Sequence, residues 1–293
     1  MFATKKSVEK MLPYELQYAA ILETIMQEGE LNHNERTDVD TRRIPSSCII
    51  VDLQKEFPIL QSKKVYWKSA LKEITWIMQK QSNKVEDLGS HIWDQWADDE
   101  GTIGKAYGFQ VSKPITVGEK TYKNQVEYVL DTLKSDQSNR RCVIDLWNVD
   151  DLGEMALTPC CYSSVWTITE GRLNCMLVQR SADFLVGVPF NTTQYAMLTY
   201  LFAIHLGVLP GILTHCMADT HVYGYKSHMQ GAKKILSNVN SLYKRNGKKR
   251  KGVPTPVFST FRNDSMNFFE MDINDFMIEQ YSPIEEIKFD VAK

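Results

Sequence analysis

The chain has 293 residues, 43% of them hydrophobic and 24% charged, with a formal net charge of -2 at pH 7. This composition is typical of a globular protein with a sizeable core, and the charge balance argues against a general nucleic-acid binder. The sequence has no apolar run near the ~18 residues of a membrane span, and its N-terminus lacks the apolar stretch of a signal peptide. We therefore expect a cytoplasmic protein. With no repeat or linker-like break, we expect one domain over residues 1–293.

The spacing of cysteines and histidines in the sequence indicates whether disulfides or a metal site are expected. Six cysteines are too sparse in a chain of this length for a disulfide framework, and they include no C-x-x-C pair. The six histidines lack the spacing of metal ligands. The sequence therefore predicts no metal site and leaves open a thiol chemistry that needs none.

The first half of the chain predicts two helices with a loop and a strand between them. Apolar residues at helical spacing predict a helix over Tyr14–Gln27, with Gly29 as its stop. The polar stretch Leu31–Ser47 is predicted to be a surface loop, and Ser47–Leu53 a strand. The second helix has Ser62 as its candidate N-cap and is apolar on nearly all sides, which indicates that it is embedded.

Several side chains in this half have both a structural and a functional interpretation. Glu73, on the embedded helix, either projects into a cavity or pairs with a cation such as Lys72. Trp93 and Trp96 precede a glycine-rich segment, where they form a wall for a flat ligand or simply belong to the core. Arg36, judged by spacing alone, is best interpreted as a solvated loop charge.

The second half predicts a short helix, a strand, a β-hairpin, a long apolar helix and a last strand, in that order. The basic segment Lys244–Lys251 is predicted to be a solvated loop, with nucleic-acid contact as the lesser alternative. The partly apolar tail, Asp275–Lys293, is predicted to dock on the body. The predicted elements are a helix over Gln125–Leu133, a strand over Cys142–Asn148, hairpin strands Val165–Thr169 and Leu173–Gln179 around Glu170-Gly171, a helix over Asn191–Ile204 ended by Gly207, and a strand over Ala218–Tyr223.

The segment from Ala156 to Asn191 carries the strongest chemical signal. It begins with Cys160 directly after a proline, continues through the hairpin to Arg180-Ser181, and ends at Asn191. We interpret Cys160 as a nucleophile, Arg180-Ser181 as an anion-binding pair and Asn191 as an amide that recognises a base. Arg140 and Arg141, before the preceding strand, are either surface charges or a phosphate clamp, since the guanidinium fork matches phosphate oxygens.

Eight segments in this order and spacing resemble the thymidylate synthase family, from about Glu35 to the last residue. The resemblance implies an α+β subunit, with a mixed β-sheet covered by helices, that works as a homodimer. It also implies reductive methylation of dUMP to dTMP, with 5,10-methylenetetrahydrofolate as carbon and hydride donor. The segments are Glu35-Arg36-Thr37, Ile92–Trp96, Tyr107-Gly108, Asn139-Arg140-Arg141, Ala156–Cys160, Gln179–Asp183, Gly187–Asn191 and Asp219–Tyr223.

The resemblance also implies roles for individual residues. The implied catalytic residues are Cys160 as nucleophile, Glu73 as proton relay, Arg180, Asp183 and Tyr107. The implied substrate-binding residues are Arg36, Arg180 and Ser181 for the phosphate, Arg140 and Arg141 from the partner subunit, Gln179, Asn191 for the pyrimidine edge, and His221 and Tyr223 for the deoxyribose. The implied folate-binding residues are Lys63, Trp93, Trp96, Asp183, Gly187, Phe190 and the tail.

The chemistry sets electrostatic requirements on this site. A thiolate added to carbon-6 of uracil makes carbon-5 an enolate carbon, so the cysteine must ionise although a free thiol has a pKa of ~8.5. Arginines favour the thiolate and burial opposes it, so we expect the arginines to prevail only if Arg180 lies close. Burial of Glu73 is expected to raise its pKa, which suits proton transfer at neutral pH.

Three departures from the family pattern motivate an alternative. Cys161 stands where many members have a histidine, and we expect it to be a packing residue rather than the nucleophile. Lys293 ends the chain where most members have valine or isoleucine, and Thr37–Thr41 replaces a glycine-rich loop. A pyrimidine hydroxymethylase, in which water replaces the hydride, is the rival activity. Asn191 favours a uracil base, and the tryptophans with the full-length tail favour hydride transfer.

A non-catalytic nucleotide- or RNA-binding protein is the third hypothesis. The basic segment Lys244–Lys251 is its only support, and the combination of Cys160, Arg180 and Asn191 argues against it.

Overall fold

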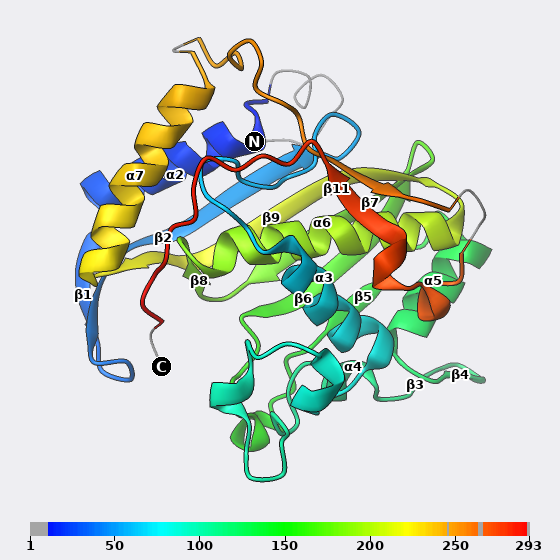
Figure 1. Ribbon diagram of the computed structural model, residues 1–293. Helices are drawn as coiled ribbons and strands as arrows, with labels where there is room; N and C mark the ends of the chain where they lie inside the picture. The colour runs from blue at the N-terminus through cyan, green and yellow to red at the C-terminus, as the bar shows by residue number, and fades with distance from the viewer. Residues whose placement is uncertain (1–10, 245, 263–265, 292–293) are drawn as a thin grey trace.

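The protein is described here by a computed structural model that covers residues 11–244, 246–262 and 266–291 (Figure 1). Within these ranges the main sheet has seven strands in the order β1-β2-β9-β7-β6-β5, and β8 pairs with β9 beside this path. Two small two-stranded sheets, β3-β4 and β10-β11, lie outside it. In the described ranges no helix is long and apolar enough to cross a membrane.

The strands have the following bounds: β1 Glu30–Asn34, β2 Val39–Asp52, β3 Ile115–Val117, β4 Lys120–Tyr122, β5 Val143–Asp145, β6 Cys161–Thr169, β7 Arg172–Gln179, β8 Ala182–Asp183, β9 Leu209–Tyr223, β10 Val257–Thr260 and β11 Phe276–Glu279. The α-helices are α2 Tyr14–Glu28, α3 Trp67–Thr75, α4 Gly108–Val111, α5 Gln125–Ser135, α6 Gly187–Leu206 and α7 Lys226–Leu242. A π-helical turn, Trp76–Lys80, continues α3, and short 3-10 turns cover Val85–Leu88, Asp94–Trp96, Leu152–Glu154, Phe268–Glu270 and Ile273–Asp275.

The main sheet is mixed. Strand β9 lies at its centre, antiparallel to β2 and parallel to β7, while the β6–β7 hairpin is antiparallel. The parallel pairing is possible because α6 crosses over between β7 and β9, as a parallel connection requires. The predicted α+β class with a mixed sheet is confirmed.

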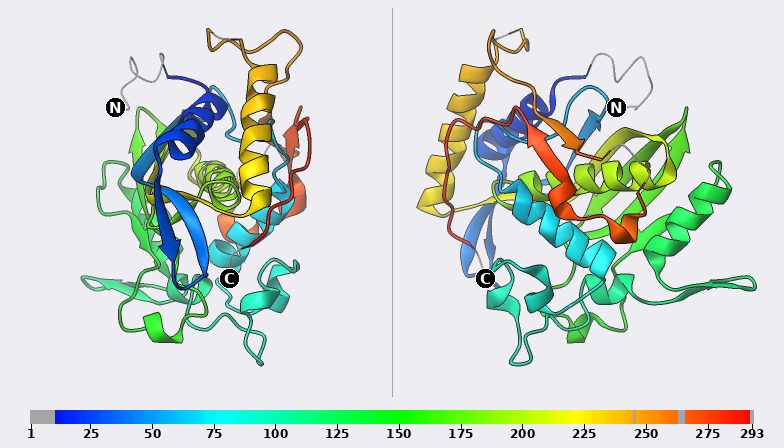
Figure 2. Two further views of the ribbon diagram at one scale, coloured as in Figure 1. Left: turned by 90° about the vertical axis from the view of Figure 1, so that its left-hand side faces the viewer. Right: turned by 45° about the vertical axis from the view of Figure 1, so that its right-hand side comes forward.

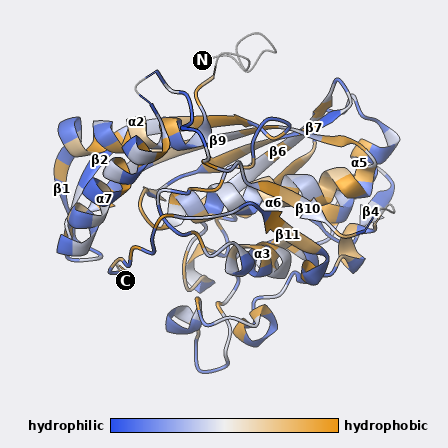
Figure 3. Ribbon diagram, turned by 45° about the horizontal axis from the view of Figure 1, so that its top comes forward, coloured by the Kyte–Doolittle hydropathy of each residue, from blue (hydrophilic) through white to orange (hydrophobic). Residues whose placement is uncertain are grey.

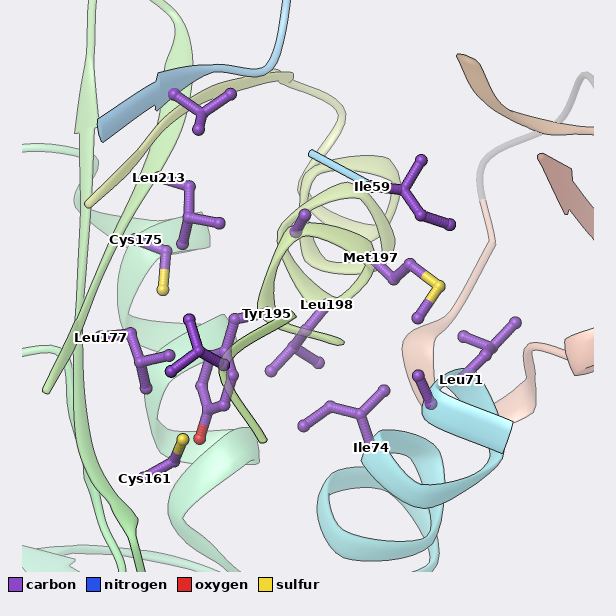
Figure 4. Close-up of a cluster of buried hydrophobic side chains, with 14 of the residues drawn as sticks. Ile59, Leu71, Ile74, Cys161, Cys175, Leu177, Tyr195, Met197, Leu198 and Leu213 are labelled. Atoms are coloured by element: carbon purple, nitrogen blue, oxygen red, sulfur yellow. The ribbon is translucent and has the colours of Figure 1, made fainter. Parts of the chain in front are cut away.

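Helix α6 is the centre of the core, since it packs on β7 and β9 on one side and on α3 on the other (Figure 2). Both sides of the helix are apolar, so its 20 residues show the all-round burial of an embedded helix. Tyr195 points from α6 toward Cys161 and Leu177 of the sheet, whereas Met197 lies on the side of Leu71 in α3 (Figure 4). The outer helices α2 and α7, in contrast, alternate hydrophobic and hydrophilic residues around their axes (Figure 3).

Most predicted elements are present. Helix α2 ends at Glu28, just before Gly29, α5 and β7 have nearly the predicted bounds, and Gly207 stops α6 with φ 67°. Strand β6 begins four residues before its predicted start, and β9 begins nine residues before its predicted start. A positive φ of this kind is the usual reason for glycine at a helix end. Helix α6 begins at Gly187, four residues before the predicted start, and the strand predicted over Cys142–Asn148 is reduced to β5.

Two predictions in the first half are wrong. Leu31–Ser47 is not a loop, because it forms β1 and most of β2, with a turn at 35–38 between them. The polar residues at the start of β2 explain the error. This part of the strand pairs with β9, and Thr41 and Arg43 line a polar cavity instead of facing a core. Ser62 is not an N-cap, because α3 begins only at Trp67 and the backbone N–H of Ser62 donates to Glu15 Oε1 at 2.6 Å.

The predictions for the basic segment Lys244–Lys251 and for the tail Asp275–Lys293 have different outcomes. Lys249 is half-buried and donates to the carbonyl of Pro254 at 3.0 Å, so the prediction of a fully solvated loop is wrong at this residue. The tail docks as predicted: the amide of Ile284 donates to the carbonyl of Gln61, and the Phe289 ring packs 5.1 Å from that of His228. Lys293 lies outside the described residues.

Candidate active site

Cys160 lies where two cavities adjoin. One cavity, of about 580 Å³, is mostly polar and is bounded by the ends of β2, β7 and β9. The other, of about 620 Å³, is mostly apolar and lies between α3, α6 and the segment 91–96. Only Trp96, Leu157 and Cys160 line both cavities among the described residues. A reactive group on Cys160 could therefore serve two different ligands.

Backbone contacts fix the position of Cys160, and a guanidinium lies beside its thiol. The residue lies just before β6, where its amide donates to the hydroxyl of Tyr107 at 3.3 Å. Its carbonyl accepts from the amide of Arg180 at 2.9 Å, and the Arg180 Nη2 atom lies 3.9 Å from the Cys160 sulfur. Carbonyls of Thr158 and Pro159 accept from the same guanidinium at 2.8 and 2.9 Å. The turn before β6 thus fixes the arginine beside the thiol.

The electrostatics of this thiol differ from the expectation. Burial raises the pKa of Cys160 above its ordinary value, and it outweighs the lowering by Arg180 and Arg36. Arg180 is as close as the sequence argument required, yet the two guanidinium groups do not offset the effect of burial on the pKa of the thiol.

Cys161 is buried on the other side of the strand. Its thiol lies 3.5 Å from Gln179 Oε1, and the residue also borders the apolar cavity. Burial raises the pKa of Cys161 well above the ordinary value. Its burial agrees with the predicted packing role.

The polar cavity collects most of the predicted phosphate and sugar ligands. Arg36, Arg180 and Ser181 line it together with His221 and Tyr223, whose rings lie 5.0 Å apart at the end of β9. Their common position confirms the strand period that placed the last two residues on one face. Arg36 lies in the turn between β1 and β2. The turn includes Asp38 at φ 51°, a conformation for which glycine is preferred.

The apolar cavity contains the predicted folate wall and the candidate proton relay. Trp93, Trp96, Gly187 and Phe190 line it with Tyr107 and Asn191. Glu73 projects into it from α3, so the alternative of a pair with Lys72 is wrong, because the Lys72 amine donates to the carbonyl of Gly89 instead.

Glu73 is buried, and burial raises its pKa to about 7. Two donors oppose this shift, the indole of Trp93 and the amide of Gln194, which lies 2.7 Å from Glu73 Oε2. The carboxyl is therefore balanced between its charged and neutral forms near neutral pH, as expected for a group that passes protons.

Gln194 is a site residue that the sequence argument missed. Its side-chain oxygen accepts from the Asn191 amide at 3.0 Å while its nitrogen donates to Glu73. It thereby joins the candidate base reader to the candidate proton relay. Residues three apart on a helix share a face, so the spacing from Asn191 could have identified it if the predicted helix had begun at Gly187.

Four predicted residues lie apart from these cavity walls. Gln179 is buried behind Cys161, where its Oε1 contacts His215 Nε2 at 2.8 Å. Lys63 is buried, donates to the carbonyl of Leu185 and lines a neighbouring cavity with Phe190. Within the described part of the chain, Arg140 and Arg141 line neither cavity and both are exposed.

Asp183 lines the polar cavity and stabilises the entry to α6. Its Oδ1 accepts from the amides of Leu185 and Val186 at 3.1 and 3.2 Å. This carboxylate therefore fixes the start of the helix that carries Asn191. In the described ranges no group of three or more histidine, cysteine or carboxylate side chains could hold a metal ion.

Comparison with known proteins agrees with this geometry. A family model described as thymidylate synthase matches residues 16–293. A thymidylate synthase of Clostridium beijerinckii is 39% identical over 282 residues, which cover 95% of this chain and 98% of that protein. One from Bacillus licheniformis is 36% identical over 293 residues, covering 96% and 100%. The solved structure of thermostable thymidylate synthase A from Bacillus subtilis matches with a TM-score of 0.83 at 34% identity, covering 96% of this chain and 99% of that one. These matches extend over nearly the whole length, and the chain belongs to the thymidylate synthase family.

Proposed function

We propose that this protein converts dUMP to dTMP by reductive methylation, with 5,10-methylenetetrahydrofolate as its co-substrate. The observation that carries the proposal is the position of Cys160 between a cavity with two arginines and a cavity walled by tryptophans. The hydroxymethylase alternative is not favoured, because the curated relatives at 35–39% identity carry the name thymidylate synthase.

The polar cavity supports binding of a nucleoside monophosphate. Arg36, Arg180 and Ser181 offer charged and hydroxyl donors to a phosphate, for which guanidinium groups are well suited. His221 and Tyr223 provide polar groups for a deoxyribose hydroxyl. In the apolar cavity Asn191, held by Gln194, presents an amide that can both donate to and accept from a uracil edge.

Four side chains would carry out the chemistry on dUMP. Cys160 as thiolate adds to carbon-6 of the uracil ring, and Asn191 stabilises the negative charge that develops on the ring oxygens. Glu73 then holds or passes the protons that the ring gives up and receives. The Arg180 guanidinium remains beside the sulfur throughout and favours its charged form when the cysteine leaves.

The residues of the apolar cavity fit a folate. A volume of about 620 Å³ lies in the range for organic co-substrates, and the indoles of Trp93 and Trp96, tilted by 57° to each other, form part of its apolar wall. When bound, methylenetetrahydrofolate supplies a one-carbon unit and a hydride. Lys63, whose pKa burial lowers to about 8, lies in the adjoining cavity where a charged extension of such a ligand would pass.

The activity has a direct test. Purified protein with dUMP and methylenetetrahydrofolate is expected to form dihydrofolate and dTMP in equal amounts, followed by absorbance and by mass spectrometry of the nucleotide. Equal yields are required because the folate carries both the carbon and the hydride. Hydroxymethyl-dUMP without dihydrofolate would establish the rival activity, and the absence of any new nucleotide would refute both.

We also propose that the protein is a homodimer whose subunits share arginines. One face of the main sheet has no helix on it among the described elements, and it bears the exposed apolar residues Val143 and Met176. Strand register places both on this face together with Val165. Burial raises the pKa of Cys160 despite Arg180 and Arg36, and Arg140 and Arg141 are exposed. Both observations support donation of these two arginines to a second copy.

Mixed dimers test this sharing. Cys160→Ser and Arg141→Ala proteins are each expected to be nearly inactive alone. After subunit exchange at equal amounts, about a quarter of wild-type activity should return, because half of the dimers are mixed and each has one intact site. Exchange is verified by native mass spectrometry. Lys134→Ala, which removes an exposed cation near the end of α5, is the matched control for Arg141→Ala. No recovery despite exchange would contradict the shared site.

A further inference from the structure

A buried histidine is connected to the turn between β7 and β8, which carries Arg180 and Ser181. His215 lies within β9, and its side chain is completely buried. Burial alternates along this part of the strand, so His215 shares with Leu213 and Met217 the face that packs on α6. The residue lines neither the polar nor the apolar cavity. A buried polar ring is costly unless its nitrogens have hydrogen-bond partners.

Both ring nitrogens of His215 have a partner. Nε2 lies 2.8 Å from Gln179 Oε1, and Nδ1 lies 3.0 Å from Thr192 Oγ1. Burial lowers the pKa of His215 to about 3, so the ring is neutral at neutral pH and carries a single N–H. One nitrogen therefore donates a hydrogen bond and the other accepts one.

Gln179 determines which nitrogen carries the hydrogen. Its amide nitrogen donates to the carbonyl of Ser181 at 2.9 Å, and a carbonyl only accepts, so the amide oxygen faces His215. His215 must then donate through Nε2, and its Nδ1 accepts from the hydroxyl of Thr192. The carbonyl of Val188 lies 2.8 Å from the same hydroxyl, but inside α6 it has a helical N–H as its donor.

We propose that His215, with its hydrogen on Nε2, is a positioning residue that fixes Ser181 for the phosphate of the nucleotide through Gln179. The inference rests on the proposed binding of dUMP in the polar cavity, which Ser181 lines. The hydrogen bonds run in one direction: the Thr192 hydroxyl donates to His215, His215 donates to Gln179, and Gln179 donates to the Ser181 carbonyl. The turn is thereby held in place before a ligand arrives, which lowers the cost of binding.

Loss of the His215 N–H would release this turn. Gln179 Oε1 would keep only the thiol of Cys161, which lies 3.5 Å away and is a weak donor. The Gln179 amide could then rotate away from the carbonyl of Ser181. Arg180 would stay in place, because its guanidinium donates to the carbonyls of Thr158 and Pro159. The expected loss is therefore in phosphate affinity and not in the chemistry at Cys160.

Two substitutions at His215 test this chain of hydrogen bonds. His215→Leu fills the space without an N–H, so dUMP should bind about 5- to 10-fold more weakly, the value of one buried hydrogen bond. His215→Gln restores an amide N–H that can donate to Gln179 and should keep the wild-type affinity. Titration calorimetry without folate measures both affinities. In turnover, kcat should change less than KM for dUMP.

A control variant and a second ligand separate positioning from a general loss of structure. Leu213→Ala opens a cavity on the same face of β9 and should lower the unfolding temperature without weakening dUMP binding. Deoxyuridine, which lacks the phosphate, should bind wild type and His215→Leu equally. Unchanged dUMP affinity in His215→Leu, or equal weakening of both ligands, would overturn the inference. Wild-type protein that binds dUMP but forms no dTMP would refute the proposed activity alone.

Nuclear magnetic resonance tests the position of the hydrogen without any ligand. In protein labelled with ¹⁵N at its six histidines, the signal that disappears in His215→Gln belongs to His215. At neutral pH this ring is expected to show a protonated Nε2 and a bare Nδ1. A hydrogen on Nδ1, or a ring protonated on both nitrogens, would contradict the chain of hydrogen bonds even if His215→Leu fails to fold.

Discussion

Replacing Cys160 by serine is expected to lower turnover of dUMP by at least ~10³-fold. A serine hydroxyl has nearly the size of the thiol, so the fold and both cavities should persist. Its oxygen, however, ionises far less readily than a thiol and is a much poorer nucleophile toward carbon-6. The loss should appear in kcat, while dUMP binding changes little, because Arg36, Arg180 and Ser181 still line the phosphate side of the cavity.

Cys161→Ser is the matched control, since it makes the same change one residue further on. That residue is buried at the border of the apolar cavity and its thiol contacts Gln179, so we expect turnover within ~10-fold of wild type. Release of the hydrogen at carbon-5 of labelled dUMP gives a second measurement, since thiolate addition alone makes it exchangeable. Exchange that survives in Cys160→Ser but disappears in Cys161→Ser would reverse the assignment of the nucleophile.

The sequence predicted the parts of the site that depend on local patterns. Glu170-Gly171 between two β-rich runs predicts the hairpin that carries Arg180, and the period of two along β9 predicts the shared face of His221 and Tyr223. The all-round apolar pattern of α6 correctly indicates a central helix. These features need only neighbouring residues, which is why they could be found without a structure.

What the sequence could not supply is the contribution of distant segments. The first half of β2 is polar because it pairs with β9 beside a polar cavity, and no periodicity reveals such a partner. The pKa of Cys160 is a balance of burial against two guanidinium groups from separate turns, Arg36 between β1 and β2 and Arg180 between β7 and β8, and the direction of the shift depends on their distances. Gln179 and His215 are likewise 36 positions apart in sequence and meet only through the pairing of β7 with β9.

Glu73→Gln is expected to lower turnover and to change how stability depends on pH. Glutamine keeps the shape but cannot take up or release a proton near pH 7, so kcat should fall by ~10²–10⁴-fold. Wild-type kcat/KM should also show an ionisation at about pH 7, the pKa to which burial raises this group, and the variant should lack it. A pH profile unchanged by the substitution would contradict the proton-relay assignment.

The same shift predicts how stability depends on pH. The folded-state pKa of Glu73, about 7, lies above its unfolded value of 4.5, so between these pH values the folded chain binds more protons than the unfolded one. The stability that this provides is complete below pH 4.5 and is lost as the pH rises through about 7, on the order of 3 kcal/mol in all. The free energy of unfolding, measured in urea, should therefore fall less steeply between about pH 5 and about pH 8 in Glu73→Gln than in wild type. The matched control is Glu127→Gln on α5, a carboxyl outside both cavities, which should keep the wild-type slope. A buried carboxyl that reduces stability at neutral pH is expected to be kept for its chemistry, and loss of both the slope and the turnover in one variant would identify Glu73 as such a group.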